Sequence, residues 1–298
     1  MGVEKSLIID GVNGKLFSPD FNFLFFFCLM VMVGVQPSFA QKAEIFGGVA
    51  QVEITPREKG YPHYRGASTG THDPLFAKAM VLMEGDEKLA LLVCDLLWIE
   101  RDLSVKVRMK IEEETGIPYQ NIIVSATHTH TGPAYHPNIR ELTGKLRIPF
   151  DTIHNTGEND SYPSWLAQKM VEAVTDAHNN ALPVNLVSGS GKAGGIAFNR
   201  RFLMKDGKVV TNPGIENPQI SRTTGPIDPM VELMLIRRKS DDLPIGSLTN
   251  FAVHADTFGG TAFGADYPGY LAQELAFILG DQLVSVFAAG ACGNINHV

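Results

Sequence analysis

The sequence predicts an α/β fold: a single domain with a mixed β-sheet flanked by helices. Three observations support this prediction. Apolar segments of strand length alternate with longer segments of helical periodicity. The 298 residues are 44% hydrophobic, which is enough for a sizeable core. The 29 glycines and 17 prolines suit a loop-rich α/β protein better than a helical bundle. We find no internal repeat and no linker that would divide the chain into two domains.

The first part of this domain is predicted to contain four strands and one helix. The helix is charged and amphipathic, and Gly116 and Pro118 would end it. The fourth strand leads directly into a run that contains two histidines. In chain order, the predicted elements are strands 45–54, 76–84 and 88–97, helix 100–115 and strand 121–127.

The second part begins with a polar segment, residues 134–161, which we predict to be a long functional loop. The following helix is predicted because apolar side chains recur on one of its faces. Asp206 and Gly207 are typical of a tight hairpin turn. In chain order, the predicted elements are helix 162–180, strand 184–192, hairpin 201–205 and 208–211, strands 230–238 and 245–254, helix 268–279 and strand 282–288.

Two histidines follow the predicted strand 121–127. Side chains two residues apart on a strand share a face, so His128 and His130 would project together from its end. A bare pair at this spacing fits a polar strand end as well as a metal site. A third histidine, His254, closes another predicted apolar strand. Because catalytic zinc sites usually take three protein ligands and leave one position open, these histidines favour a metal site.

Six segments of the chain resemble, in the right order, the neutral, non-lysosomal ceramidase family. The run S-A-T-H-T-H-T-G-P at 125–133 is the most specific of them. The resemblance is to the bacterial branch, and it implies a catalytic N-terminal domain that is incomplete at its C-terminus. The resembling segments are residues 48–56, 69–75, 125–133, 199–200, 250–254 and 288–296.

The resemblance implies roles for four residues. His128 and His254 match the positions that bind zinc in the family, and His130 matches the histidine that lies near the substrate amide. Arg200 matches an arginine that contacts the substrate. The family completes its zinc site with a Glu and a Tyr at positions that would lie beyond residue 298.

One family loop, with the pattern G-D-V-S-P-N, is altered in this chain. Asn294, Asn296 and His297 stand where the family has Asp, Ser and Pro. This chain therefore has no serine at that position to perform the role that the serine has in the family.

The implied function is zinc-dependent hydrolysis of the amide bond of an N-acyl lipid resembling ceramide. The products would be a free base and a fatty acid, which places the reaction in sphingolipid metabolism. Two alternatives stay open: an exported, non-catalytic protein that binds lipid or glycan, and a zinc hydrolase that acts on another amide or ester. A membrane surface is a candidate partner. The net charge of −7, without basic clusters, argues against nucleic-acid binding.

Three further residues are candidates for the site. Asp256 and Asp266 flank the loop after His254, and a carboxylate there could orient or bind the metal ligands. Turn formation is the alternative for both, which we favour for Asp256, whereas we favour a site role for Asp266. His72 either lines the cleft or is an ordinary loop histidine. The remaining histidines, His63, His136, His154 and His178, are expected to have no catalytic role.

The N-terminal region resembles an export signal. An apolar run at 23–33 is short for a membrane span, and small residues at Ser38 and Ala40 resemble a cleavage site before Gln41. We therefore expect residues 1–40 to be a signal peptide or N-terminal anchor, followed by the domain 41–298, and the protein to be periplasmic or secreted. Cys94 and Cys292 are expected to be buried free thiols.

Overall fold

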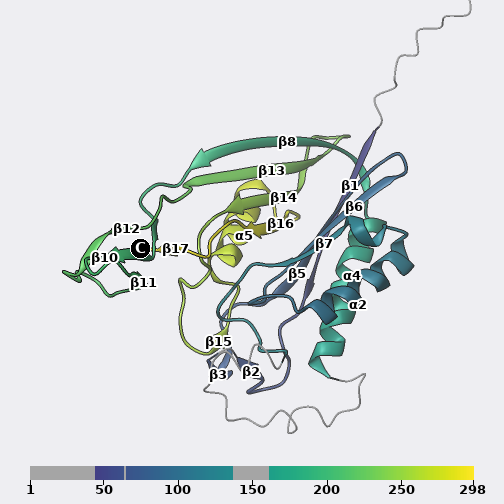
Figure 1. Ribbon diagram of the computed structural model, residues 1–298. Coiled ribbons are helices and arrows are strands. Elements are labelled where there is room, and N and C mark those ends of the chain that lie inside the picture. Colours follow the sequence, from purple (N-terminus) through teal and green to yellow (C-terminus); the bar gives the residue numbers. More distant parts are fainter. Residues whose placement is uncertain (1–43, 64, 137–160) are drawn as a thin grey trace, which may run out of the picture. The chain divides into compact units, whose positions relative to one another are not determined.

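An eight-stranded mixed sheet organises the chain (Figure 1). The computed structural model describes residues 44–63, 65–136 and 161–298, and these form one unit, Glu44–Val298. The expected leader at 1–40, His154 and most of the expected loop at 134–161 lie outside the described residues.

The sheet has the strand order β16-β14-β13-β8-β1-β5-β6-β7. β14 pairs with β16 and β6 with β7 in parallel, and the other neighbours are antiparallel, so the predicted mixed sheet is confirmed. The bounds are β1 (Ile45–Glu53), β5 (Phe76–Glu84), β6 (Glu87–Cys94), β7 (Ile122–Ala126), β8 (Leu182–Lys192), β13 (Met230–Arg238), β14 (Pro244–Phe251) and β16 (Val284–Ala289).

Two helices cover one face of the part of this sheet that β1, β5, β6 and β7 form. α2 (Arg101–Thr115) ends, as predicted, at Gly116, whose φ of 65° suits glycine. α4 (Tyr162–Asn179) packs on β1, β5 and β6 and buries its apolar face, including Leu166 and Met170. β1 and α4 approach so closely that a Cβ at Gly48 would lie 1.9 Å from the Ala177 carbonyl oxygen. A glycine is therefore required at this crossing.

A further helix, α5 (Asp266–Leu279), packs against β16. It begins two residues before the predicted start, at a residue whose side chain belongs to the neighbouring loop. In the described part of the chain, no helix is both long and apolar enough to cross a membrane. Cys94 and Cys292 are buried free thiols, as predicted.

Short strands connect the loops around these elements. The predicted hairpin forms around Asp206 and Gly207, and a third strand joins it. Several of these strands were not predicted, because two or three residues are too few to show a periodicity. The short strands are β2 (Pro62–His63), β3 (Gly66–Ala67), β4 (Gly70–Thr71), β9 (Ala197–Asn199), β10 (Arg201–Met204), β11 (Val209–Thr211), β12 (Ile220–Thr223), β15 (Ala262–Phe263) and β17 (Ile295–His297).

Candidate metal centre

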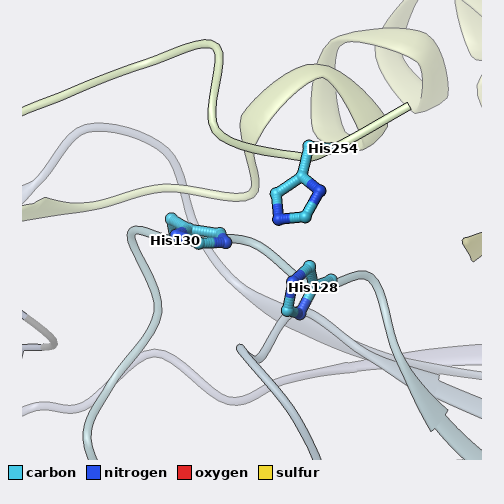
Figure 2. A group of neighbouring side chains, drawn as sticks. All are labelled: His128, His130 and His254. Atoms are coloured by element: carbon cyan, nitrogen blue, oxygen red, sulfur yellow. The ribbon is translucent and has the colours of Figure 1, made fainter. Parts of the chain in front are cut away.

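Three histidine rings converge at one place, although they come from two segments far apart in the chain (Figure 2). The ring centroid of His128 lies 4.9 Å from that of His130 and 4.8 Å from that of His254. The centroids of His130 and His254 are 5.2 Å apart. One potential ligand atom of each ring lies within 4.8 Å of the other two. The structure therefore brings together the two expected metal ligands and the histidine expected beside the substrate.

The backbone around His128 differs from the predicted conformation. The strand ends at Ala126, so His128 and His130 lie in the following loop and their convergence does not come from strand alternation. His128 has a φ of 65°, in the left-handed region that residues other than glycine rarely adopt. Backbone strain of this kind is found most often at functional sites, where surrounding contacts hold it in place.

Buried threonines fix this loop to the segment that carries the third histidine. The hydroxyls of Thr129 and Thr131 each donate a hydrogen bond of 2.8 Å to the Gly264 carbonyl. The His130 backbone N–H donates to the Ala255 carbonyl at 3.1 Å. The loop after β7 and the loop after β14 are thereby held together, and the rings with them.

Hydrogen bonds to carbonyl groups orient two of the three rings. His128 Nδ1 lies 2.7 Å from the Leu97 carbonyl oxygen, and His254 Nδ1 lies 2.9 Å from the Cys292 carbonyl oxygen. A carbonyl oxygen only accepts, so each Nδ1 donates the hydrogen bond, and the neutral form of each ring has its lone pair on Nε2. Histidines that bind metals are commonly held in this way, with one ring N–H on a carbonyl or carboxylate.

Burial favours the neutral form of the imidazoles of His130 and His254. It lowers the pKa of His130 to about 4, although the carboxylate of Asp256 acts in the opposite direction. It also lowers the pKa of His254, against the effect of the hydrogen bond to Cys292. Neutral imidazole is the form that binds metal ions, and a set of imidazole nitrogens suits zinc, copper, iron or nickel. The residues present therefore fit a transition-metal ion.

Arg200 lies beside the three histidines, directly after β9. Its Nε and Nη2 donate to the Gly293 carbonyl at 3.2 and 2.8 Å, and Nη2 is 3.5 Å from His254 Nε2. Its backbone N–H donates to the Asn294 carbonyl. The guanidinium is thus held at the edge of the site, where it can donate further hydrogen bonds to a bound molecule.

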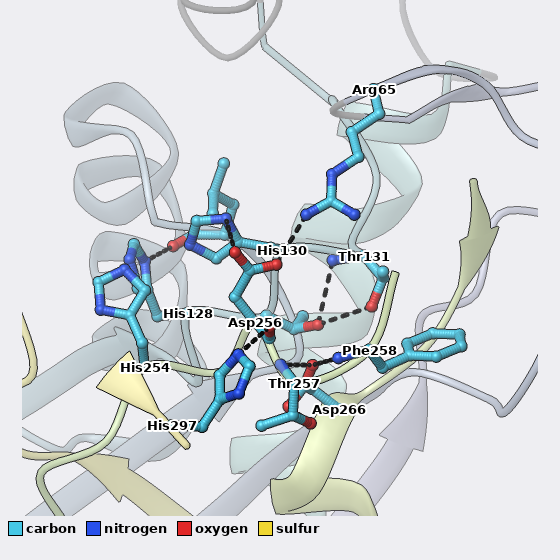
Figure 3. A network of polar contacts seen from close by, with 12 residues as sticks. Arg65, His128, His130, Thr131, His254, Asp256, Thr257, Phe258, Asp266 and His297 are labelled. Carbon is cyan, nitrogen blue, oxygen red and sulfur yellow. Dashed lines mark hydrogen bonds and ion pairs between the residues drawn. The ribbon is translucent and has the colours of Figure 1, made fainter. Parts of the chain in front are cut away.

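Asp256 occupies a central position among the polar groups of the site, as Figure 3 shows. Its Oδ1 accepts from Arg65 Nη2 at 2.7 Å, and its Oδ2 lies 3.9 Å from His130 Nδ1. Its backbone carbonyl accepts a hydrogen bond of 2.6 Å from His297 Nε2. Arg65 was not predicted as a site residue, because nothing in the sequence around it indicates a contact with a residue 191 positions away.

Asp266 is a buried carboxylate that holds the loop after His254. It accepts from the Thr257 N–H at 3.0 Å, the Thr257 hydroxyl at 2.8 Å and the Phe258 N–H at 3.2 Å. Asp266 itself has a φ of 57°. Its role is therefore to fix the backbone of Thr257 and Phe258, which directly follow Asp256.

His72 contacts the outer side of the same loop. Its Nδ1 lies 2.7 Å from Asp73 Oδ1, and its ring centroid lies 4.6 Å from that of Phe258. The side chain is 44% exposed. Of the three further candidates, His72 is thus the most peripheral, and Asp256 is the one that faces a histidine of the site.

Comparisons of sequence agree with the order of motifs. A family model described as "Neutral/alkaline non-lysosomal ceramidase, N-terminal" matches residues 40–270. A neutral ceramidase of Oryza sativa subsp. japonica is 26% identical over 228 residues, which cover 73% of this chain and 26% of the relative. A neutral ceramidase of Pseudomonas aeruginosa is 24% identical over 263 residues, covering 86% and 36%. The chain thus spans roughly a quarter to a third of the length of these relatives.

Comparison of structures gives the same fold. The crystal structure of neutral ceramidase from Pseudomonas aeruginosa superposes with a TM-score of 0.64 at 19% identity, covering 86% of this chain and 40% of that one. A ceramidase complexed with C2 gives a TM-score of 0.67, also at 19% identity, covering 85% and 39%.

Proposed function

This chain belongs to the neutral/alkaline non-lysosomal ceramidase family, and we propose that it carries part of the site of a zinc-dependent amide hydrolase. The substrate would be an N-acyl lipid of the ceramide type, and the products a free base and a fatty acid. The observation that supports this proposal best is the convergence of His128, His130 and His254, each of which has a potential ligand nitrogen within 4.8 Å of those of the other two.

In this proposal His128 and His254 hold the ion through Nε2. Their Nδ1 atoms are committed to backbone carbonyls, which leaves the Nε2 lone pairs for the metal. When bound, a zinc ion supplies a Lewis acid that polarises the amide carbonyl and activates water.

Arg200 and His130 act on the substrate itself. The guanidinium of Arg200 donates to the carbonyl oxygen, where negative charge develops as the carbonyl carbon is attacked. A water oxygen bonds to that carbon, and a proton from the water passes to His130. The C–N bond then breaks, and the same proton passes to the amine nitrogen. The balance is one amide and one water giving one carboxylic acid and one amine.

A direct test is the release of fatty acid from ceramide in detergent micelles by the purified protein with and without a chelator. We expect release that the chelator abolishes and added zinc restores. We expect Arg200→Met to lower kcat by about 100-fold, because one charge-stabilising donor is typically worth that much. Arg201→Met, the neighbouring and more exposed arginine, is the matched control. Zinc-loaded protein that releases no fatty acid from ceramide or from related lipid amides would contradict the proposal.

We further propose that residues 1–40 direct export. The apolar run and the small residues before Gln41 support this. N-terminal sequencing of the protein recovered from its native compartment tests it, with Gln41 expected as the first residue. An intact Met1 on protein recovered from the cytoplasm would contradict it.

A further inference from the structure

The three histidines of the site differ in what faces their Nδ1 atoms. For His128 and His254 the partner is a neutral backbone carbonyl, at 2.7 and 2.9 Å. For His130 the carboxylate of Asp256 faces Nδ1, with Oδ2 at 3.9 Å. A carbonyl orients an imidazole without favouring its charged form strongly, whereas a carboxylate favours imidazolium.

Contacts hold Asp256 through its carboxylate, its backbone carbonyl and the residues that follow it. Arg65 Nη2 binds Oδ1 at 2.7 Å, and His297 Nε2 donates to the backbone carbonyl at 2.6 Å. On the C-terminal side, the next two backbone N–H groups are bound by the buried carboxylate of Asp266. With its backbone and one oxygen held, Asp256 presents its other oxygen to His130 (Figure 3).

We propose that Asp256, held by Arg65, is a positioning residue that makes His130 the proton-carrying histidine of the site, while His128 and His254 are left to hold the ion. The inference rests on the proposed hydrolase function and assigns roles within it. The carboxylate keeps the proton of the resting ring on Nδ1 and turns Nε2 to the substrate. When Nε2 takes a proton from water, the carboxylate stabilises the resulting imidazolium until the amine nitrogen receives that proton.

Arg65 has a defined part in this arrangement. It lies in the turn between β2 and β3, and Ala134, which follows the histidine loop, is hydrogen-bonded through its N–H to Pro62 in β2. The turn that carries Arg65 is thereby held next to the histidine loop. Because both Arg65 and Asp256 are about one-third exposed, their ion pair contributes only about 0–1 kcal/mol to stability, and its removal should leave the protein folded.

The first test reads the position of the proton without relying on activity. In the purified full chain, side-chain 15N NMR of His130 should show the proton on Nδ1. In Asp256→Asn, the amide oxygen would turn to Arg65 and the NH2 group would face His130, so the proton should move to Nε2. Asp241→Asn, which alters the exposed pair with Arg238, is the matched control and should leave the His130 spectrum unchanged. An unchanged His130 spectrum in Asp256→Asn would overturn the proposal.

The second test separates proton transfer from metal binding. Asp256→Asn should keep its bound zinc and its KM but lose at least ~100-fold in kcat, the range for a general acid–base group. In a His130→Gln background, Asp256→Asn should cause no further loss of kcat. In the wild-type background, Arg65→Lys should retain more activity than Arg65→Met. Loss of zinc from Asp256→Asn, as expected for His128→Ala, would show that His130 is a ligand and would overturn the assignment. If the wild type binds no zinc and cleaves no amide, the proposed function fails, and the NMR result decides the positioning role alone.

Discussion

At the scale of single residues, the partners of the ring nitrogens carry most of the information about the site. Leu97 and Cys292 contribute only their carbonyl groups, so their side-chain identity gives no signal in the sequence. Asp256 and Asp266 were both visible as carboxylates in a loop, but their tasks differ. Asp256 faces His130, and Asp266 binds backbone N–H groups. The preference for turn formation at Asp256 and for a site role at Asp266 stays a prediction.

Replacement of Asp266 by asparagine should destabilise the protein. The side chain is 1% exposed and accepts three hydrogen bonds from Thr257 and Phe258, so an NH2 group there would face N–H donors. We expect a loss of about 2–4 kcal/mol in the free energy of unfolding, measured with urea. Asp228→Asn, which affects one exposed hydrogen bond to Met230, should cost less than about 1 kcal/mol. Equal losses in the two variants would contradict this role for Asp266.

His63 should make stability depend on pH. The residue is fully buried, and its Nε2 has no hydrogen-bond partner among the described residues. Burial, and then the charge of Arg65, lowers the pKa of His63 from 6.5 to about 4. Between these two pKa values, His63 binds a proton in the unfolded chain but not in the folded chain. The contribution of the neutral His63 to stability is therefore complete above pH 6.5 and is lost as the pH falls toward 4.

The size of this effect can be measured with a neutral replacement. Between pH 7 and pH 4, the wild type should lose up to about 3 kcal/mol more unfolding free energy than His63→Gln. Urea unfolding at several pH values gives both curves. Parallel curves for the two proteins would mean that His63 titrates normally in the folded state.

At the scale of elements, the long strands and helices were predictable because each has enough residues to show a period. β1, β5, β13, α2 and α4 lie within two residues of their predicted bounds. The short strands were not predictable, and they matter to the site, since the turn between β2 and β3 delivers Arg65 and β17 ends at His297. The position of His128 was predicted, but its left-handed backbone was not, because contacts with a distant segment impose it.

The crossing of β1 and α4 gives a prediction at this scale. Gly48→Ala would place a Cβ 1.9 Å from the Ala177 carbonyl oxygen, so strand and helix must separate. We expect a cost of about 3 kcal/mol or more in unfolding free energy, because overpacking against backbone cannot be relieved by a side-chain rotation. Gly189→Ala in β8, where a Cβ meets nothing within 4 Å, is the matched control. It should be neutral or slightly stabilising, and a similar loss in both variants would show that the close crossing is unimportant.

At the scale of the whole molecule, one sheet carries the three histidines on the loops at its strand ends. His128 and His130 follow β7, which is one edge strand, and His254 follows β14, which lies next to the other edge. Sequence patterns located these loops, since each follows an apolar strand. They could not show that the two loops meet, because that depends on how the sheet and α5 bring them together. The order of family motifs supplied this information instead, and the geometry of the three rings agrees with it.

The central claim is that these loops form a metal site, and elemental analysis of the purified protein tests it most directly. We predict about one zinc ion per chain in the wild type and in His136→Ala, whose histidine lies near Glu100 and Asp102 rather than in the site. We predict no zinc in His128→Ala or His254→Ala. Zinc retained in both of these variants, or absent from all four proteins, would contradict the account.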